Sequence, residues 1–141
     1  MILETKHHGK KEYERNDIIT FKKGLPGFEN LKNFIIFPVE ENDVFSVLHS
    51  VEDLTLGFIL VSPFFVMEDY ELELNEDKLQ NLEITRPEDV SVFNTVTLST
   101  KMEDITTNLQ APIIINIISK LGEQIILTNE KYKIKYPLLK K

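Results

Sequence analysis

The chain has 141 residues, 42% of them hydrophobic, which is enough to bury one core, so we expect a single domain over residues 1–141. It contains no cysteine, which excludes disulfide bonds, thiolate metal sites and cysteine nucleophiles and is compatible with a reducing cytosol. The net charge of −7 is unevenly spread: residues 40–104 contain 16 acidic and 3 basic side chains, a balance of −13, whereas the flanks balance at +6.

This acidic middle disfavours direct binding to nucleic acid, because phosphate contacts need Lys and Arg. It favours encounter with a basic protein, whose complementary potential raises the association rate. An acidic surface that only keeps the protein soluble explains the same charge, so composition alone leaves both interpretations open.

Neither the N-terminus nor any internal segment is expected to enter a membrane. Residues 1–8 lack the basic and then apolar layout of a signal peptide. The longest apolar run, residues 56–67, contains Ser62 and Pro63 and is far shorter than the ~20 residues that span a bilayer. We therefore expect a soluble, cytoplasmic protein.

The first half of the chain indicates short strands joined by tight turns. Pro26 and Gly27 occupy the second and third positions of a type II turn, in which the glycine takes a positive φ. His7 and His8 indicate a surface turn rather than a metal site, since adjacent strand residues face opposite ways and the only other histidine is His49. The strands expected here cover residues 1–6, 17–21, 33–39, 44–50 and 56–61.

Residues 64–74 join two phenylalanines and a methionine directly to an acidic, alternating segment. Glu71 and Glu73 would project to one side of an extended chain, with tyrosine and leucine on the other, as in an outer strand. An apolar patch rimmed with charge is also typical of a protein-binding surface. The sequence alone leaves open an edge strand of the core and a partner surface.

The second half of the chain is expected to contribute a short helix and the central strand of the core. Asn75 is a suitable N-cap for a helix with two leucines on its inner face. After a strand over 90–99 and a loop over 102–110, residues 113–118 contain five isoleucines broken only by Asn116 and predict a buried strand, apolar on both faces. A turn at 121–122 and further strands over 123–128 and 131–136 complete the expected elements.

Closely spaced strands without βαβ alternation or an internal repeat predict a mostly β fold, a small antiparallel β-barrel-like domain with one or two short helices. No constellation for catalysis is present in the sequence. It has no Gly-x-Ser-x-Gly elbow, no carboxylate pair marked out by its spacing, and no histidines at ligand spacing. We expect neither an enzyme nor a cofactor.

Four blocks of residues carry a resemblance to a known family. The most specific is the run Asn-Leu-Gln-Ala-Pro at residues 108–112, followed by Ile-Ile-Ile-Asn. The others are Ile-Thr-Phe with Gly-Leu-Pro-Gly-Phe-Glu at 19–21 and 24–29, Leu-His-Ser at 48–50, and Pro-Phe with Asp-Tyr at 63–64 and 69–70. Over nearly its whole length the chain resembles the FliW family of flagellar assembly factors. His49 departs from the family pattern, in which glutamine is expected.

The resemblance implies a regulator without catalytic activity and with a small, mostly β, barrel-like fold. Such a protein binds flagellin in the cytoplasm. When flagellin is exported, the freed protein captures the RNA-binding translational repressor CsrA, and flagellin translation resumes. We expect a monomer in the free state, with no direct contact to nucleic acid.

Combined with the charge pattern, the resemblance suggests a mechanism in which the acidic middle lies beside the basic RNA groove of the repressor and repels phosphate without occluding the groove. Two alternatives are a barrel that binds a small ligand in a polar-lined cavity and a barrel that binds RNA through basic and aromatic residues. The residues predicted for the partner-binding surface are Phe64, Met67, Glu68, Asp69, Tyr70, Glu71, Glu73 and Asn108.

Overall fold

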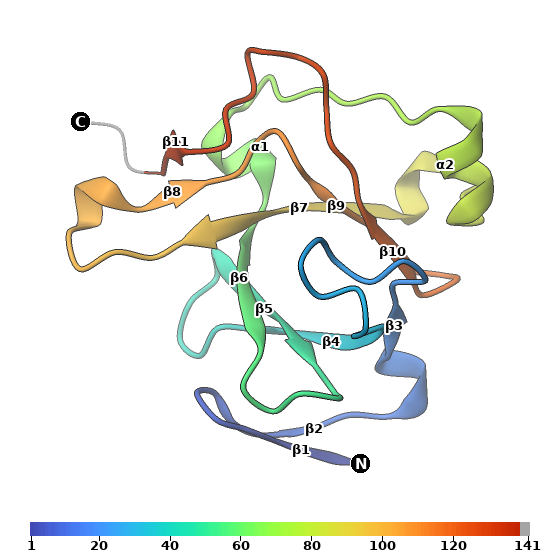
Figure 1. The fold of residues 1–141 in the computed structure, drawn as a ribbon, viewed down its shortest axis with the longest axis vertical. Helices are drawn as coiled ribbons and strands as arrows, with labels where there is room; N and C mark the ends of the chain where they lie inside the picture. The colour runs from blue at the N-terminus through green and yellow to red at the C-terminus, as the bar shows by residue number, and fades with distance from the viewer. Residues whose placement is uncertain (139–141) are drawn as a thin grey trace.

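The computed structural model describes residues 1–138 and consists mostly of β-strands (Figure 1). Two short helices, α1 (Pro63–Val66) and α2 (Glu76–Asn81), follow one another in the chain, and single 3-10 turns cover Arg15–Asp17, Pro87–Asp89 and Met102–Asp104. Within residues 1–138, no helix combines the length and apolarity that a bilayer crossing requires. The strands are β1 (Ile2–Thr5), β2 (Gly9–Glu12), β3 (Ile19–Thr20), β4 (Asn33–Pro38), β5 (Phe45–Ser50), β6 (Gly57–Val61), β7 (Val90–Thr97), β8 (Thr106–Thr107), β9 (Ile113–Asn116), β10 (Leu121–Gln124) and β11 (Tyr136–Pro137).

Seven strands close into a barrel, in the order β7-β6-β5-β4-β3-β10-β9, with β9 pairing back onto β7. Neighbours in the barrel are antiparallel except β3 and β10, which run parallel and meet where Leu121 lies opposite Thr20. β8 and β11 extend the sheet beside β7, while β1 and β2 form a separate hairpin. The predicted mostly β, barrel-like fold with short helices is confirmed, and its one parallel seam is a difference from the antiparallel prediction.

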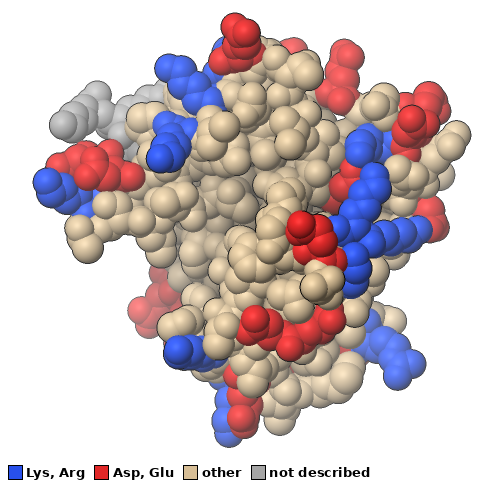
Figure 2. All heavy atoms as spheres, viewed as in Figure 1, with Lys and Arg blue, Asp and Glu red and all other residues tan. Residues whose placement is uncertain are grey.

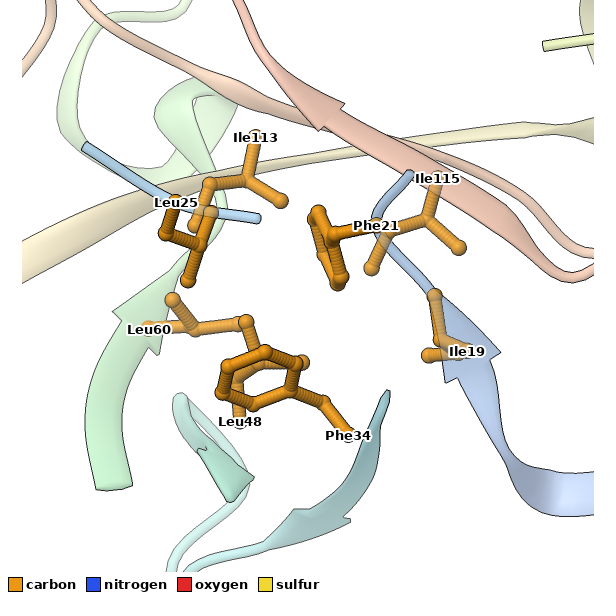
Figure 3. Close-up of a cluster of buried hydrophobic side chains, with 8 residues drawn as sticks. All are labelled: Ile19, Phe21, Leu25, Phe34, Leu48, Leu60, Ile113 and Ile115. Carbon is orange, nitrogen blue, oxygen red and sulfur yellow. The ribbon is translucent and has the colours of Figure 1, made fainter. Parts of the chain in front are cut away.

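The interior of the barrel is filled by eight apolar side chains that converge from five strands and the loop after β3 (Figure 3). The rings of Phe21 and Phe34 meet edge to face with centroids 5.4 Å apart, a favoured aromatic geometry. Leu48 points into the barrel. Because successive side chains on a strand face opposite ways, its neighbour His49 lies on the other face of the sheet, where it is also buried. The eight residues are Ile19, Phe21, Leu25, Phe34, Leu48, Leu60, Ile113 and Ile115.

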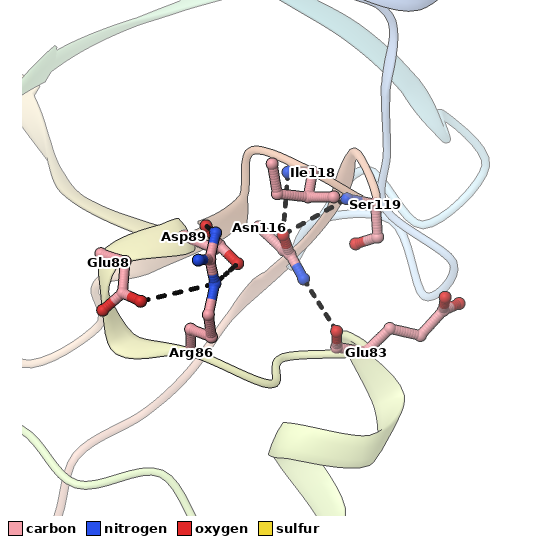
Figure 4. Close-up of polar contacts among 7 residues, drawn as sticks. All are labelled: Glu83, Arg86, Glu88, Asp89, Asn116, Ile118 and Ser119. Carbon is pink, nitrogen blue, oxygen red and sulfur yellow. Dashed lines mark hydrogen bonds and ion pairs between the residues drawn. The ribbon is translucent and has the colours of Figure 1, made fainter.

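The isoleucine strand is shorter than predicted, because Asn116 turns the chain. Its Oδ1 atom accepts hydrogen bonds from the backbone N–H groups of Ile118 (2.9 Å) and Ser119 (3.3 Å), so the strand ends there (Figure 4). Ile117 and Ile118 are consequently 44% and 68% exposed, and the prediction of five buried isoleucines is wrong for these two. The turn lies at residues 117–120, not 121–122, and the following strand covers Leu121–Gln124 rather than 123–128.

One further predicted strand, over 131–136, and the edge strand that was one of two interpretations of 64–74 are absent from the described residues. Residues 64–74 form helix α1 and an irregular segment, because Ser62 and Pro63 provide the N-cap and first position of a helix. Residues 131–136 are likewise irregular, and only Tyr136 and Pro137 pair with β8. The alternation of lysines with apolar residues predicted a strand here. Instead, the segment buries Tyr132, which is 4% exposed, against distant parts of the chain.

The type II turn is confirmed by both its hydrogen bond and its backbone geometry. The N–H of Phe28 donates to the carbonyl of Leu25 at 2.7 Å, and Gly27 has a φ of +86°. Leu25 plugs the barrel from this turn, whereas Phe28 stays 39% exposed and meets the ring of Phe58 edge to face. The turn therefore closes one end of the core.

Candidate partner-binding surface

Helix α1 presents two phenylalanine side chains to solvent. Pro63 and Val66, three residues apart, share the buried face of the helix, and Val66 packs in a cluster with Val61. Phe64 and Phe65 lie on the opposite face and are 52% and 60% exposed. The local sequence thus fixes an apolar protrusion at the end of β6.

Tyr70 lies beneath this protrusion and holds two distant segments together. It is 3% exposed, its ring lies 4.5 Å from that of Tyr132, and its hydroxyl donates to the carbonyl of Leu109 at 2.7 Å. Burial raises the pKa of Tyr70 to about 12, the nearby Tyr132 adds to the rise, and a hydrogen bond with Asn94 partly opposes it. Tyr70 supports the surface from below, with Phe64 meeting its ring edge to face at 6.0 Å.

Asn108 shapes the loop that precedes Pro112. Its Oδ1 atom accepts from the N–H groups of Gln110 (3.0 Å) and Ala111 (3.1 Å), and its backbone carbonyl accepts from Asn94 Nδ2 at 2.6 Å. The side chain is half-buried. The next residue, Leu109, accepts the hydrogen bond of Tyr70. Asn108 therefore lies close to Tyr70 and not on the exposed part of the predicted surface.

The acidic residues of the predicted surface are exposed along the irregular segment after α1. Lys131 Nζ lies 3.1 Å from Asp69 Oδ2, and this contact with Asp69 raises the pKa of Lys131. Both side chains are well exposed, so the pair contributes little to stability. Met67 is half-buried against the tyrosines. The exposed carboxylates are those of Glu68, Asp69, Glu71 and Glu73.

A hollow of about 780 Å³ lies between this segment and helix α2. Its floor is formed by Val90 and Val92 of β7, and Leu72 and Leu74 contribute further apolar surface. Glu71, Glu73 and Arg86 supply the charged groups. No local sequence pattern predicts the hollow, because its walls come from segments that only the closed barrel brings together. The lining residues are Phe64, Tyr70, Glu71, Leu72, Glu73, Leu74, Leu79, Ile84, Thr85, Arg86, Pro87, Val90 and Val92.

The positive charge of Arg86 is already paired within the hollow's rim (Figure 4). Its Nη2 and Nε atoms lie 3.0 and 3.2 Å from the carboxylate of Asp89, and Nε lies 3.4 Å from Glu88. The hydrogen bond and charge of Asp89 raise the pKa of Arg86. Because Arg86 is paired with Glu88 and Asp89, the carboxylates of Glu71 and Glu73 make the rim of the hollow acidic.

Figure 2 shows charged side chains of both signs on this face: acidic groups lie right of its centre and below it, basic groups lie beside them, and the upper middle is largely uncharged. The acidic balance of residues 40–104 is therefore not spread over this face as a uniform negative field. One cause is that the basic flank folds back onto the middle, as Lys131 does onto Asp69.

His49, where the resemblance led us to expect glutamine, is buried beneath the β1–β2 hairpin and is 1% exposed. Its Nδ1 atom lies 2.8 Å from the carbonyl of Ser50, and its ring centroid lies 6.2 Å from that of His8. His7 and His8 lie in the turn that the sequence predicted. Among residues 1–138, no three His, Asp or Glu side chains are grouped so as to hold a metal ion.

Comparison with known proteins agrees with this architecture over the whole chain. The model of the FliW protein family matches residues 2–138. The flagellar assembly factor FliW of Clostridium novyi (strain NT) is 59% identical over 140 residues, covering 99% of this chain and 98% of the relative. That of Clostridium botulinum (strain Okra) is 56% identical with the same coverage. A crystal structure of the flagellar assembly factor FliW superposes with a TM-score of 0.90 at 40% identity, covering 99% of this chain and 98% of that one. The chain belongs to the FliW family of flagellar assembly factors.

Proposed function

We propose that the protein is a non-enzymatic, cytoplasmic flagellar assembly factor that binds flagellin and, when free of it, binds and antagonises the translational repressor CsrA. Membership of the FliW family over the whole chain is the observation that carries this proposal. The surface supports it, because exposed Phe64 and Phe65 lie next to a run of carboxylates, an arrangement suited to protein binding. In this proposal the protein needs no cofactor and makes no direct contact with RNA.

The acidic segment gives this function a physical mechanism. Held beside the basic RNA groove of the repressor, its carboxylates raise the local negative potential and disfavour phosphate. Such an effect at a second site requires a coupling free energy between the two binding events, typically ~1–3 kcal/mol. Complementary charge also raises the rate of encounter with the basic repressor.

Reversing the four carboxylates to lysine (E68K, D69K, E71K and E73K together) tests this mechanism. We expect association with CsrA to slow at least tenfold at low salt, because steering depends on complementary potentials, and the salt dependence of the rate to flatten. Stopped-flow association kinetics at several ionic strengths measure both quantities.

A matched control reverses four exposed carboxylates elsewhere, E40K, E41K, E103K and D104K, so that the net charge changes equally. If both quadruple variants slow association to the same extent, net charge alone acts and the segment after α1 has no special role. If the first variant associates at the wild-type rate, the segment has no role in steering and its carboxylates only keep the protein soluble.

Competition between the two partners tests the proposed function itself. Full-length protein immobilised as bait should retain flagellin and CsrA separately from solution at micromolar concentrations. Displacement of CsrA by flagellin supports a shared or coupled site, and a ternary complex places the partners on separate faces. Retention of neither protein overturns the proposal, and a gel shift of bare flagellin leader RNA would favour the RNA-binding alternative instead. The eight apolar side chains that fill the barrel argue against an interior ligand cavity.

A further inference from the structure

Beyond Gln124, where β10 ends, the chain continues in strand-like pairing and has an open edge. This continuation pairs inward through the N–H groups of Ile125, which donates to Pro112 O at 2.9 Å, and Leu127, which donates to Gln110 O at 2.7 Å. Backbone groups of alternate residues on a strand point to opposite sides, so those of Gln124, Ile126 and Thr128 point away from β9. On that side β3 pairs with β10 only at Leu121 among residues 1–138. The backbone of 124–128 therefore faces outward without a backbone partner in the described chain.

Two other strand edges of the molecule are protected, whereas this one is not. The β1–β2 hairpin carries charges such as Glu4, Lys10 and Glu12, and β11 ends in Pro137. Charges and proline are the usual means by which proteins discourage pairing at an edge. The residues whose backbone faces outward at 124, 126 and 128 are uncharged, and Ile126 is 70% exposed. An unprotected edge of this kind is suited to accepting another strand.

A groove of about 630 Å³ runs along this edge and has charged walls. One wall is the loop containing Lys23 and Glu29, and the other is the segment from Glu73 into α2, which contributes Lys78. Both lysines are engaged by Glu123: Lys23 Nζ lies 3.8 Å from Oε1, and Lys78 forms an ion pair with the other oxygen. The walls consequently present Glu29 and Glu73, both exposed, as unneutralised carboxylates in the described structure.

We propose that the edge at residues 124–128 binds an extended, basic segment of a partner protein by β-strand addition. Main-chain hydrogen bonds to alternate residues supply the affinity. A Lys or Arg of the segment that faces Glu29 and Glu73 makes the edge prefer a basic segment to an acidic one. Four residue steps at ~3.3 Å per residue span roughly 13 Å, so a segment of about five residues matches the edge. This site is separate from the phenylalanines of α1, and it stands whether or not flagellin or CsrA is the partner.

The test uses the full-length protein labelled with ¹⁵N and a capped hexapeptide of alternating lysine and valine as the probe. At a peptide concentration ten times its Kd, water-exchange NMR should show the amides of Gln124, Ile126 and Thr128 exchanging about tenfold more slowly, since only the unbound fraction exchanges. A hexapeptide of alternating glutamate and valine should bind at least tenfold more weakly. Absence of protection at these three amides overturns the proposal.

Variants separate backbone pairing from side-chain contact. I126P removes an N–H that points outward, which an edge strand tolerates, and should abolish protection, whereas I126A keeps the N–H and should retain it. If I126P does not fold, a peptide N-methylated on its edge-facing amides makes the same test from the other side. Equal binding by I126P, or by the methylated peptide, overturns strand addition. Concentration-dependent protection without peptide, together with a dimer in sedimentation, would assign the edge to a second copy of this chain and overturn the partner assignment.

Discussion

Tyr70 couples the surface segment to the loop before β9 through one buried hydroxyl. Its hydrogen bond to the carbonyl of Leu109 joins residues that are 39 positions apart in the chain. Ionisation would place a negative charge against that carbonyl in a buried site, which is why burial raises the pKa of this side chain to about 12. The residue therefore links the stability of the candidate surface to pH.

We expect the stability of the protein to fall as the pH rises from about 10 to about 12 more steeply than in a Tyr70→Phe variant. The folded pKa of Tyr70 lies above the unfolded value of 10, so the stabilisation is fully present below pH 10 and is lost as the pH passes through about 12. Urea midpoints measured between pH 8 and 11.5 report the difference. At pH 8 the variant should be less stable by about 1–2 kcal/mol, because the Leu109 carbonyl loses its donor.

Tyr13→Phe is the matched control for this experiment. The Tyr13 side chain is half-buried. Its hydroxyl forms no hydrogen bond within residues 1–138. The control should keep the alkaline loss of stability, because Tyr70 is intact in it. Parallel curves for wild type and Tyr70→Phe would show that the Tyr70 hydroxyl is not responsible for the alkaline loss.

At the scale of elements, Asn116 joins the end of α2 to the turn between β9 and β10 (Figure 4). It is 2% exposed, and its Nδ2 donates to the carbonyls of Leu82 (2.8 Å) and Glu83 (3.1 Å), while its Oδ1 accepts from the turn. One side chain thereby satisfies backbone groups of two elements. Buried backbone groups that lose such partners are costly.

We expect Asn116→Ala to lower the free energy of unfolding by about 2–4 kcal/mol, since several backbone groups lose their partners at once. Asn116→Asp keeps the acceptor for the turn but directs a carboxylate at two carbonyls, so it should be at least as destabilising. Asn108→Ala, which removes a similar but half-buried turn contact, should cost less. Urea unfolding measures all three, and a wild-type midpoint for Asn116→Asp would show that the tie to α2 contributes nothing.

The sequence predicted elements well where local pattern and turn chemistry agree. Strands expected over 33–39, 44–50, 56–61 and 90–99 are found within two residues of those bounds, because alternation and flanking turns are local properties. The helix capped by Asn75 also forms, with Lys78 N donating to the cap oxygen at 2.9 Å. These predictions were reliable because the residue alternation, the flanking turns and the helix cap all indicated the same elements.

Predictions failed where tertiary contacts outweigh the local pattern. The alternation over 64–74 made an edge strand one of two interpretations, but no strand forms there, because Tyr70 is anchored by Leu109 and Tyr132, which are distant in the chain. Of the predicted surface, Phe64 and the four carboxylates are exposed, whereas Tyr70 and Asn108 lie beneath it or beside it. The hollow next to α2 has no local sequence signal, since its floor is β7.

At the scale of the whole molecule, the barrel closes at a parallel seam between elements that are about a hundred residues apart. Thr20 of β3 lies opposite Leu121 of β10, and the N–H of Thr20 donates to the carbonyl of Lys120 at 2.8 Å. Directly after each partner, Phe21 and Gly122 meet: a Cβ on Gly122 would lie 2.7 Å from the Phe21 ring. Closure therefore depends on a glycine that leaves room for a fully buried phenylalanine.

We expect Gly122→Ala to destabilise the protein by about 1–3 kcal/mol, because the added methyl group forces the buried ring of Phe21 to move. Phe21→Leu alone should cost about 1–2 kcal/mol through the space it leaves. In the double variant the smaller side chain accommodates the methyl group, so the loss should be at least 0.5 kcal/mol smaller than the sum of the single losses, as expected for residues in contact. Urea unfolding of the four proteins completes the cycle. Additive losses would mean that Gly122 and Phe21 are not coupled. The glycine would then be needed for the backbone conformation at the seam, not to make room for the Phe21 ring.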